Sequence, residues 1–482
     1  MKLAPYPEYK DSDVPWLGKV PAHWNVVKLR RVVSFNPSKS ETRANPADEA
    51  KVVFLPMEKI SASGRIDCGE KRPLSEVWSG FPYFRRGDVV VAKITPCFEN
   101  GKGAYLKWLE TDFGFGTTEL IVLRPSETID GAFLRLITST KRFLLLGKLH
   151  MTGAAGQQRI PTDFVKNYLV GLPAPSEQDR IARFLDWKTS QINKFIRNKR
   201  RLIELLKEQR QNVINQAVTR GLDPNVRLKP SGVEWIGDIP EHWEVRRLRT
   251  LAAVRPSGLD KNSNESEVPV MLCNYVDVYK NDRITSTIDF MKATATPDEI
   301  RALELKAGDV IITKDSESWD DIAVPSFVPE AMPGVVCAYH LALVRPFAGK
   351  IEGEYLFRAF AADPIADQFR VAATGVTRFG LAQGAINGAF FPLPSMEEQR
   401  AIVDHISRRL AETDQAITRA QREIELMREY RIRLISDVVT GQVDVRGIKV
   451  PEVAEDELLA LEDDAAESDE VVDDEGEMDE SD

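Results

Sequence analysis

The chain contains one sequence unit twice, and this duplication constrains its fold more than any other feature. W-L-G-K-V-P-A-H-W begins at Trp16, and W-I-G-D-I-P-E-H-W begins at Trp235, 219 positions later. R-R-G-D-V-V-V-A-K and K-A-G-D-V-I-I-T-K follow in register, and the offset stays between 219 and 222 throughout. Residues 177–223 match 398–444 without a gap, with 14 identities in 47. A repeat of about 220 residues therefore has to be explained before any single motif.

Each repeat has a globular part followed by a helical part. In the globular part the runs V-V-F-L, D-V-V-V-A and E-L-I-V-L predict strands, and F-L-R-L-I-T-S-T-K-R-F-L-L-L predicts one helix. The helical part follows the bend L-P-A-P-S, where Ser176 suggests a helix start, and has no proline or glycine before Gly221. The sister segment is free of both from Ser395 to Gly441. Together these parts predict the α+β fold class.

Both helical parts carry apolar residues spaced three and four positions apart, which predicts a coiled-coil seam. A seam of about 12 turns is too long for its own globular part to cover, so we expect the two helices to pack against each other. Arg210 and Arg431 interrupt the seam at equivalent sites. We expect their side chains to reach solvent, with a contact to a second protein as the alternative. The predicted seam residues are Leu185, Ile192, Ile196, Ile203, Leu206, Val213, Ile406, Leu410, Ile417, Ile424, Met427 and Leu434.

The net charge of −10 hides two differently charged parts of the chain. Residues 452–482 contain 17 Asp and Glu and no Lys or Arg. The preceding residues 1–451 then carry 64 basic against 57 acidic side chains, a charge of +7. A segment this acidic and this poor in aromatic residues is expected to be disordered, with solubility as its simplest role.

Composition also excludes several classes of protein. The sequence contains no run of about 18 apolar residues, so no membrane span is predicted. Its first residues lack the apolar core of a signal peptide. We therefore expect a cytoplasmic protein. The four cysteines form no C-x-x-C pair, which argues against a zinc site and a disulfide framework and favours free thiols. They are Cys68, Cys97, Cys273 and Cys337.

Signals for catalysis are weak, and we predict no catalytic residue and no metal ligand. The chain has no G-x-x-x-x-G-K-[ST] phosphate loop and no [DN]-P-P-[YFW] loop of the kind that adenine methyltransferases use. P-D at Pro297 and E-L-K at Glu304 echo the acid–lysine pattern of many nucleases. Pro297 also suits the first turn of a helix, and the first repeat has no counterpart. His23 and His242 lack nearby cysteine or histidine partners for a metal.

The opening W-x-G-x-[IV]-P-x-H-W, the entry [LF]-P-x-P-S-x-E-Q and the long helix, each present twice, resemble the specificity (S) subunit of type I restriction–modification systems. The resemblance covers residues 5–445. It implies two target recognition domains, each reading one half of a split DNA sequence. It also implies that the long helices form an antiparallel coiled coil, which spaces the domains in a pseudo-two-fold tandem repeat and receives two modification subunits.

The resemblance further implies partners and a division of the chain. The partners are double-stranded DNA, two modification (methyltransferase) subunits and restriction (endonuclease/translocase) subunits. S-adenosylmethionine, ATP and Mg belong to those subunits, and this chain holds no cofactor and no active site of its own. The division is a first target recognition domain at 1–174, a first spacer helix at 175–222, a second target recognition domain at 223–393, a second spacer helix at 394–445, and an acidic tail at 446–482.

Elementary geometry agrees with a split target. Antiparallel helices relate two tandem units by a pseudo-two-fold axis, and a DNA duplex has local two-fold symmetry as well. A helix of about 42 residues rises roughly 63 Å, close to two duplex turns of about 34 Å each. Two rival functions stay open: a scaffold that binds only protein, and a self-sufficient nuclease built around residues 297–306.

Polar loops rich in glycine are the places where a recognition domain contacts DNA. A-K-I-T-P-C-F-E-N-G-K-G-A-Y, from Ala92, resembles a stretch common in such domains, whereas D-S-E-S-W-D-D follows Lys314 in the second repeat. The two domains are therefore expected to read different bases. The predicted DNA-binding residues are Lys93, Thr95, Asn100, Lys102, Thr117, Thr118, Gln157, Gln158 and Arg159 in the first domain, and Lys314, Ser316, Tyr339, Thr377 and Arg378 in the second.

Three further features carry open alternatives. The paired tryptophans, two rings that bracket a proline, are interpreted as rigid anchors at the entry to each domain. The acidic tail is a candidate competitor of nucleic acid for the basic body. Matched basic clusters are either phosphate clamps or solvated strand faces, and they comprise Lys28, Arg30, Arg31, Arg246, Arg247 and Arg249.

Overall fold

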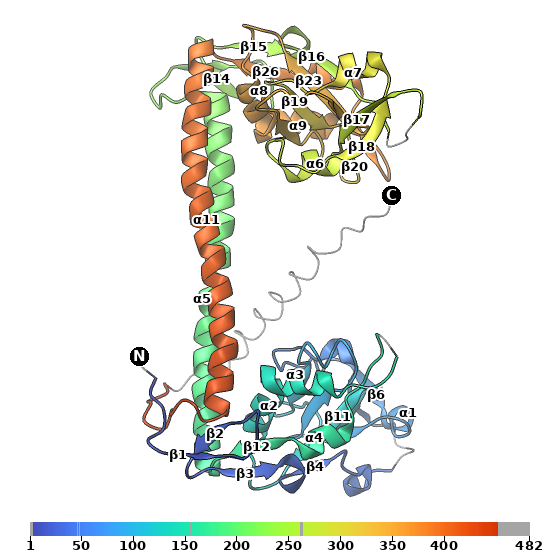
Figure 1. Ribbon diagram of the computed structural model, residues 1–482, viewed down its shortest axis with the longest axis vertical. Coiled ribbons are helices and arrows are strands. Elements are labelled where there is room, and N and C mark those ends of the chain that lie inside the picture. The colour runs from blue at the N-terminus through green and yellow to red at the C-terminus, as the bar shows by residue number, and fades with distance from the viewer. Residues whose placement is uncertain (1–2, 46, 48, 155, 261–263, 452–482) are drawn as a thin grey trace. The chain divides into compact units, whose positions relative to one another are not determined.

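The computed structural model describes residues 3–451, except 46, 48, 155 and 261–263, so the acidic residues 452–482 lie outside it. The chain divides into two compact units, one formed by 1–201 with 421–482 and the other by 202–420. Each unit contains a β-rich globular domain and parts of two long helices, α5 (Pro175–Arg220) and α11 (Met396–Val439) (Figure 1). The predicted α+β class with two long helices is thereby confirmed.

The first globular domain contains two four-stranded sheets and two strand pairs within the described residues. Its strands are β1 (Tyr9–Asp11), β2 (Lys19–Pro21), β3 (Asn25–Lys28), β4 (Val33–Phe35), β5 (Lys51–Leu55), β6 (Lys71–Pro73), β7 (Tyr83–Arg85), β8 (Val89–Ala92), β9 (Gly103–Tyr105), β10 (Phe113–Gly116), β11 (Leu120–Pro125) and β12 (Leu169–Leu172), and its helices are α1 (Leu74–Val77), α2 (Gly131–Ser139), α3 (Lys141–Leu149) and α4 (Thr162–Asn167). The sheets have the orders β6-β5-β10-β7 and β4-β11-β8-β9, and β10 runs parallel to β5.

The second globular domain repeats this plan. Its strands are β13 (Leu228–Pro230), β14 (Asp238–Pro240), β15 (Glu244–Arg247), β16 (Ala252–Pro256), β17 (Val268–Cys273), β18 (Met291–Ala295), β19 (Val310–Thr313), β20 (Asp315–Ser316), β21 (Pro325–Phe327), β22 (Val335–Cys337), β23 (Leu341–Pro346), β24 (Thr374–Gly375), β25 (Phe379–Gly380) and β26 (Phe390–Leu393), and its helices are α6 (Tyr275–Lys280), α7 (Pro297–Leu303), α8 (Gly353–Phe360), α9 (Asp363–Ala372) and α10 (Gln383–Gly388). The order β16-β23-β19 corresponds to β4-β11-β8, and the parallel pair β17–β22 corresponds to β5–β10.

One buried ion pair explains why G-D and R-P recur in both repeats. Asp88, 1% exposed at the start of β8, accepts hydrogen bonds from Arg124 on β11 at 2.7 and 2.8 Å. In the second domain Asp309 accepts from Arg345 at 2.8 and 2.7 Å in the same way. A buried carboxylate is stabilised by such a bidentate partner. The aspartate of G-D and the arginine of R-P therefore depend on each other in both repeats.

The three strands expected in the first domain coincide with β5, β8 and β11, because each is a short, mostly buried run of β-branched residues. The helix expected after β11 is wrong in one respect, since it is two helices, α2 and α3. Thr140 has extended backbone angles (φ −64, ψ 138), and its hydroxyl accepts from the backbone of Phe143. The same threonine thus ends one helix and caps the next.

In the first unit, residues 175–201 of α5 and 421–439 of α11 pack side by side in opposite directions. Arg431 donates to Asn193 at 2.8 Å, and Lys199 pairs with Glu423 at 2.6 Å. From Asn193 to Lys199 the partners on α11 change from Arg431 to Glu423, so these two helix segments are antiparallel. The Arg431 side chain, which was expected to reach solvent, is half-buried and contacts an amide on the neighbouring helix.

In the second unit, residues 202–220 of α5 and 396–420 of α11 pack against the second globular domain in one core. That core includes Ile214 and Val218 of α5, Ile406 of α11 and the domain residue Trp243. Arg210 donates to Asp282 of the domain at 2.7 Å and lies 3.6 Å from Asp414 of α11. The Arg210 side chain is 34% exposed and forms these ion pairs at the edge of the domain.

The residues assigned to the helix seam are all at least partly buried. Within unit 1 and unit 2 taken separately, their apolar side chains lie on the face of each helix turned away from solvent. The buried ones are Leu185, Ile192, Ile196, Ile203, Ile406, Leu410, Ile424 and Leu434, and the half-buried ones are Leu206, Val213, Ile417 and Met427.

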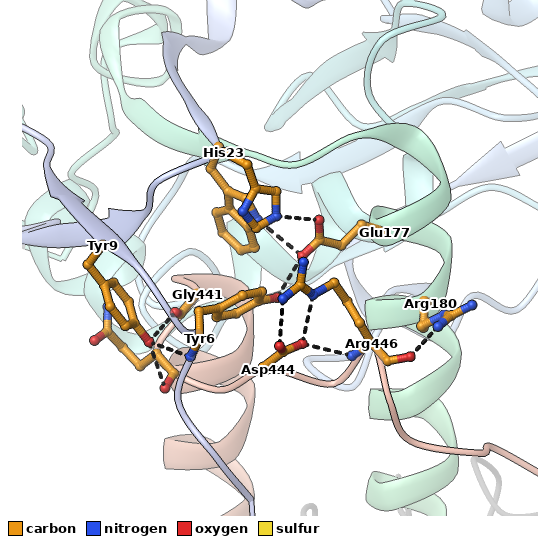
Figure 2. A network of polar contacts seen from close by, with 10 residues as sticks. Tyr6, Tyr9, His23, Glu177, Arg180, Gly441, Asp444 and Arg446 are labelled. Carbon is orange, nitrogen blue, oxygen red and sulfur yellow. Dashed lines mark hydrogen bonds and ion pairs between the residues drawn. The ribbon is translucent and has the colours of Figure 1, made fainter.

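The repeated H-W and E-Q motifs meet in the structure. Glu177, in the first turn of α5, accepts hydrogen bonds from Tyr6 at 2.7 Å and from the indole of Trp24 at 3.2 Å, and it contacts His23 at 2.9 Å (Figure 2). Burial, together with the adjacent carboxylate, raises the pKa of Tyr6. This glutamate therefore fastens the entry of the domain to the start of its long helix.

We call this joint between the H-W motif and the glutamate of the long helix a latch. The second repeat forms an equivalent latch in which other residues contact the glutamate. Glu398 of α11 contacts His242 at 2.7 Å and accepts from Trp243 at 3.3 Å. Ser395 caps the helix and donates to the same carboxylate at 2.8 Å. Because a carboxylate holds each histidine, both are accounted for by this structural role.

The glutamine of each E-Q motif forms a hydrogen bond at the start of a shorter helix of its domain. Gln178 accepts from the backbone of Asp130, which caps α2, at 2.8 Å, and Gln399 accepts from Glu352, which precedes α8, at 2.8 Å. Both glutamines are fully buried. The E-Q dipeptide thus joins each long helix to two parts of its domain.

The buried tryptophans also receive the ends of the long helices. Gly441, just past α11, has φ +76, and a Cβ there would lie 3.1 Å from the Trp24 ring. Gly221, just past α5, has φ +74, and a Cβ there would lie 3.2 Å from the Trp243 ring. Trp24 and Trp243 are buried anchors as expected, whereas Trp235 is 44% exposed.

Candidate nucleic-acid interface

Several predicted DNA-binding residues of the first domain come together where two distant loops pair. Ile94 and Thr152 each form an antiparallel bridge with Arg159. The backbone of Thr95 donates to the carbonyl of Gln158 at 2.9 Å, and the Thr95 hydroxyl accepts from the Gln158 backbone at 3.1 Å. The loop that follows Gly153 is thereby fixed against the segment that begins at Lys93.

An ion pair closes this junction. Both guanidinium nitrogens Nε and Nη2 of Arg159 donate to Glu119 at 2.9 Å, and the Lys93 backbone donates to the carbonyl of Glu119 at 2.9 Å. These hydrogen bonds from Arg159 hold the pKa of Glu119 below its ordinary value. The arginine fork is therefore engaged by a carboxylate, while the neighbouring Gln157 is exposed.

The second domain builds the same junction at equivalent positions. Asp315 of β20 pairs with Gly380 of β25, and Thr374 of β24 pairs with the same glycine. Relative to Ile94, Arg159 and Thr152, these positions are shifted by 221, 221 and 222. The backbone of Lys314 donates to His340 at 2.8 Å, as Lys93 does to Glu119. The two domains thus share one scaffold for this site.

The side chains on that scaffold are different. His340 occupies the place of Glu119, and its Nδ1 lies 2.7 Å from Asp315, the counterpart of Ile94. Lys314 lies 3.1 Å from the same carboxylate and 5.5 Å from the centre of the Tyr339 ring. In the second domain the basic partner therefore lies at the position of Glu119, and the acidic partner lies at the position of Ile94.

The β24–β25 hairpin carries the most exposed large hydrophobic side chain of the described residues, Val376 at 92%. Thr377 and Arg378 follow at the exposed tip, and Arg378 has no ion pair within the part of the chain that the structure describes. Gly375 at the hairpin base has φ +154, and a Cβ there would lie 1.9 Å from the carbonyl of Arg378. Only glycine fits at this close approach.

The remaining predicted residues are more scattered. Thr117 and Thr118 lie in the turn that leads to Glu119. Asn100 is exposed in a neighbouring turn, and Lys102 is half-buried with its amine 3.4 Å from the carbonyl of Met57. Ser316 is only 6% exposed, and its hydroxyl accepts from Ser318 at 3.2 Å, so it lies beneath this surface.

Residue-by-residue reasoning missed the charged partners Glu119, Asp315 and His340. The repeat itself held a usable signal, because positions 119 and 340 lie 221 apart and carry opposite chemical types. An aromatic set beside the second junction was missed as well: Tyr275 and Tyr279 stack at 5.7 Å, and Trp319 is 54% exposed.

The basic clusters have mixed surroundings. Arg246 pairs with Glu244 at 2.8 Å, and the Arg247 guanidinium lies 4.8 Å from the Phe390 ring. Lys28 is half-buried, whereas Arg30, Arg31 and Arg249 are exposed.

Among the described residues, no group of three or more His, Cys, Asp or Glu is arranged to hold a metal ion. No described helix is long and apolar enough to cross a membrane. The four cysteines are free thiols, and Cys273 lies beside Cys337 on neighbouring parallel strands, where burial raises the pKa of both.

The nuclease-like residues lie in α7 and the segment after it. Pro297 is in the first turn, Thr296 and Glu299 form a capping box, and Asp298 pairs with Arg301. Glu304 accepts from the backbone of Gly334 at 3.0 Å. Asp298 is thus on a capped helix, whereas the nuclease pattern needs its acids on neighbouring strands.

Known proteins of similar sequence share one description. No family model matches the chain. Over 184 residues, 37% of this chain, it is 37% identical to the type I restriction enzyme EcoAI specificity subunit and 35% identical to the EcoEI specificity subunit, both from Escherichia coli. These matches cover 30% of each relative's length. A longer match, 22% identical over 89% of this chain and 96% of the relative, is to the putative type I restriction enzyme MjaX specificity subunit of Methanocaldococcus jannaschii.

Solved structures agree on the fold. A chain from a structure describing complex assembly and conformational transition of the type I R-M system has a TM-score of 0.68 and 17% identity, covering 87% of this chain and 98% of that one. The HsdS subunit from Thermoanaerobacter tengcongensis has a TM-score of 0.57 and 18% identity, covering 88% and 98%. The duplicated motifs, the paired long helices and these similarities agree: the chain is similar in sequence to type I restriction enzyme specificity subunits and shares the fold of the solved HsdS subunit.

Proposed function

We propose that this chain is the sequence-specific DNA-binding subunit of a type I restriction–modification complex, and that each globular domain reads one half of a bipartite target. One observation carries the proposal: both domains present the same three-segment junction, with different side chains on it. A shared scaffold with exchanged side chains is what two half-sites of different sequence require, because base edges are distinguished by their donors and acceptors.

The exposed side chains suggest which bases each domain prefers. At the second hairpin, Arg378 offers a fork for the O6 and N7 acceptors of guanine, and Val376 offers an apolar surface for the methyl group of thymine. At the first junction, the Arg159 fork is engaged by Glu119. Gln157 is the exposed group there, and its amide suits adenine. The other predicted loop residues, Lys93, Lys102, Lys314 and Thr377 among them, are then positioned to contact phosphates or flanking bases.

In this proposal the chain is non-catalytic and works in the cytoplasm. Modification subunits would supply methyl transfer with S-adenosylmethionine, and restriction subunits would supply ATP- and Mg-dependent cleavage. The names of the relatives support this role. The long paired helices are the proposed docking and spacing element for the modification subunits.

Two other functions make different predictions. A scaffold that binds only protein would show no affinity for DNA in the presence of its modification subunit. A self-sufficient nuclease would cleave DNA as the purified chain with a divalent metal, and changing Asp298 would abolish that cleavage. The Asp298–Arg301 ion pair on α7 favours neither alternative.

The direct experiment is a salt-titrated DNA-binding measurement of the chain with and without its modification subunits, followed by mapping of methylated sites. The proposal predicts tight binding to one bipartite sequence. It also predicts that the logarithm of the binding constant falls linearly with the logarithm of the salt concentration, because phosphate contacts release counterions. Binding that is equal for all sequences, or no binding in the assembled complex, would refute it.

A further inference from the structure

A strongly basic stretch of α5 is not used by the proposed DNA-reading surfaces. From Trp187 to Ile203 this helix contains six cationic residues and no Asp or Glu. We call these six residues the basic stripe: Lys188, Lys194, Arg197, Lys199, Arg200 and Arg201.

Part of the basic stripe is directed away from the packed face of α5. Lys194, Arg197 and Arg201 are three and four positions apart, so they lie on one side of the helix. The buried residues Ile192 and Ile196 lie on the opposite side. Lys194 and Arg201 are exposed to solvent. This side of α5 therefore presents concentrated positive charge.

The neighbouring stretch of α11 carries no net charge of its own. Residues 421–439 of α11 contain four cationic and four acidic side chains, so they add no net charge. Glu423 is taken up by Lys199 of the stripe at 2.6 Å. Two other acidic residues pair with arginines of α11 itself, Glu425 with Arg422 and Asp437 with Arg433. Counted together, residues 187–203 and 421–439 carry ten cationic and four acidic side chains, an excess of six positive charges.

The described part of the chain ends close to the same helix. The carbonyl of Arg446 accepts a hydrogen bond from the side chain of Arg180, in the second turn of α5 (Figure 2). The Arg446 guanidinium pairs with Asp444 at 2.8 Å and lies 4.8 Å from the centre of the Tyr6 ring. The chain is thus fastened to the start of α5 only five residues before Pro451.

We propose that the acidic segment 452–482 docks on the basic stripe of α5. The segment carries 17 acidic and no basic residues, and it follows a stretch that is fastened at Arg446 to the helix that carries the stripe. From Arg180 to Arg201 the helix rises roughly 32 Å, whereas a segment of 31 residues can extend up to about 100 Å. Charge, attachment point and reach all favour this occupant over a separate molecule.

Tethering makes this docking effective even if each contact is weak. A segment joined to the same chain acts at an effective concentration in the millimolar range. Individual exposed ion pairs are weak and are screened by salt, so we expect many exchanging contacts. Any other polyanion that approaches the stripe must first displace the segment.

Zero-length cross-linking tests the proposal on the full chain. A carbodiimide joins a carboxylate to a lysine amine only when the two touch, so mass spectrometry should find residues 452–482 linked to Lys188 and Lys194 at low salt. Lys194→Arg keeps the charge and should remove only its own link. Links spread evenly over Lys141 and Lys166 of the first globular domain, with none to the stripe, would overturn the proposal.

A protection measurement gives an independent readout. We compare acylation of Lys194 in the natural chain with a full-length variant whose 17 acidic residues after Pro451 are changed to Asn and Gln. With a local dissociation constant of about 0.1 mM, millimolar effective concentration gives roughly tenfold protection. Lys166, outside the stripe, serves as the internal control and should react equally in both chains.

Charge reversal distinguishes docking on the basic stripe from a general attraction of the acidic segment to the positively charged chain. Lys194→Glu with Arg201→Glu should abolish the cross-links to Lys188, while Lys141→Glu with Lys166→Glu, which changes the total charge equally, should preserve them. Thermal unfolding of each variant checks that it is folded. If Lys194 is protected only after DNA is added, the stripe is a nucleic-acid surface and the proposal is wrong.

Discussion

The indole nitrogen of Trp24 donates to the carboxylate of Glu177 at 3.2 Å, which joins the entry of the first globular domain to the first turn of α5. The same relationship recurs between Trp243 and Glu398 at 3.3 Å. The distance between the partners in sequence, 153 and 155 residues, spans almost the whole of each domain. Each latch therefore closes one domain onto its own long helix.

Glu177→Gln should destabilise the chain markedly. The carboxylate is 8% exposed and serves three side chains, and hydrogen bonds to a buried charged group contribute about 1.5–3 kcal/mol each. An amide cannot accept from all three, so we expect a loss of roughly 2–3 kcal/mol in the free energy of unfolding. Denaturant titration of the full chain measures it. Glu76→Gln, at an exposed site on α1, is the control, and equal stability of the two variants would contradict the latch.

Glu398 should make stability depend on pH in the acid range. Burial alone would raise the pKa of Glu398, but hydrogen bonds from His242, Ser395 and Trp243 lower it to about 2. A carboxyl group with a lowered pKa stabilises the folded state above its ordinary value of 4.5 and loses this contribution as pH falls toward 2. Glu398→Gln should flatten the stability profile between these values, measured by unfolding at a series of pH values. An unchanged profile, with Glu397→Gln as control, would contradict the assignment.

Arg378→Ala and Gln157→Ala should affect different halves of the DNA target. Loss of a bidentate base contact costs about 1–3 kcal/mol of discrimination. Methylation mapping of the assembled complex should therefore show relaxed sequence preference at one position of the second half-site for Arg378→Ala, and of the first for Gln157→Ala. Arg433→Ala, on the exposed face of α11, should leave both halves unchanged. Relaxation in the same half by both variants would contradict the division between domains.

Gly375→Ala should abolish DNA recognition by the second domain without unfolding it. The new Cβ would lie 1.9 Å from a backbone carbonyl that cannot move independently, so the hairpin must rearrange. We expect a loss of DNA affinity at least as large as for Arg378→Ala, together with a nearly unchanged melting temperature. Gly384→Ala is the matched control, since nothing lies within 4 Å of its added Cβ. Equal DNA affinity of the two variants would show that the hairpin does not contact DNA.

Lengthening the long helices should change the spacing of a bipartite target. Four inserted residues add about 6 Å of helix, and base pairs are about 3.4 Å apart along the duplex. We therefore expect the unread gap to grow by one or two base pairs, and methylation mapping measures it. An unchanged gap in a complex that still methylates DNA would refute the role of the helices as a spacer.

Features that depend on local pattern or on the repeat were predictable from sequence. The strands β5, β8 and β11 follow from short β-branched runs, and the long helices follow from apolar residues three and four positions apart. The polar, glycine-rich loops chosen as DNA-binding also contain residues of both loop junctions. The break at Thr140 was missed, because a threonine inside an apolar helical pattern gives no warning that its hydroxyl will cap the next helix.

Contacts between distant segments were not predictable. Arg159 meets Glu119 across 40 residues, and His340 meets Asp315 across 25, because strand register brings them together. Arg210 binds Asp282, 72 residues away on the globular domain, a partner that the helix pattern does not indicate. The periodicity of apolar residues identifies the buried face of a helix. It does not indicate which distant carboxylate will contact a side chain on the opposite face.

Gly441 closes α11 against Trp24, and Gly221 closes α5 against Trp243, so each compact unit borrows a helix end from the other repeat. Neither half of the gene encodes a finished folding unit. A polypeptide holding one repeat would leave its tryptophan uncovered until a second such polypeptide supplied the missing helix. Fusion of the two repeats into one chain thus turns an association that would depend on concentration into one that is permanent, and it frees the two reading surfaces to diverge separately.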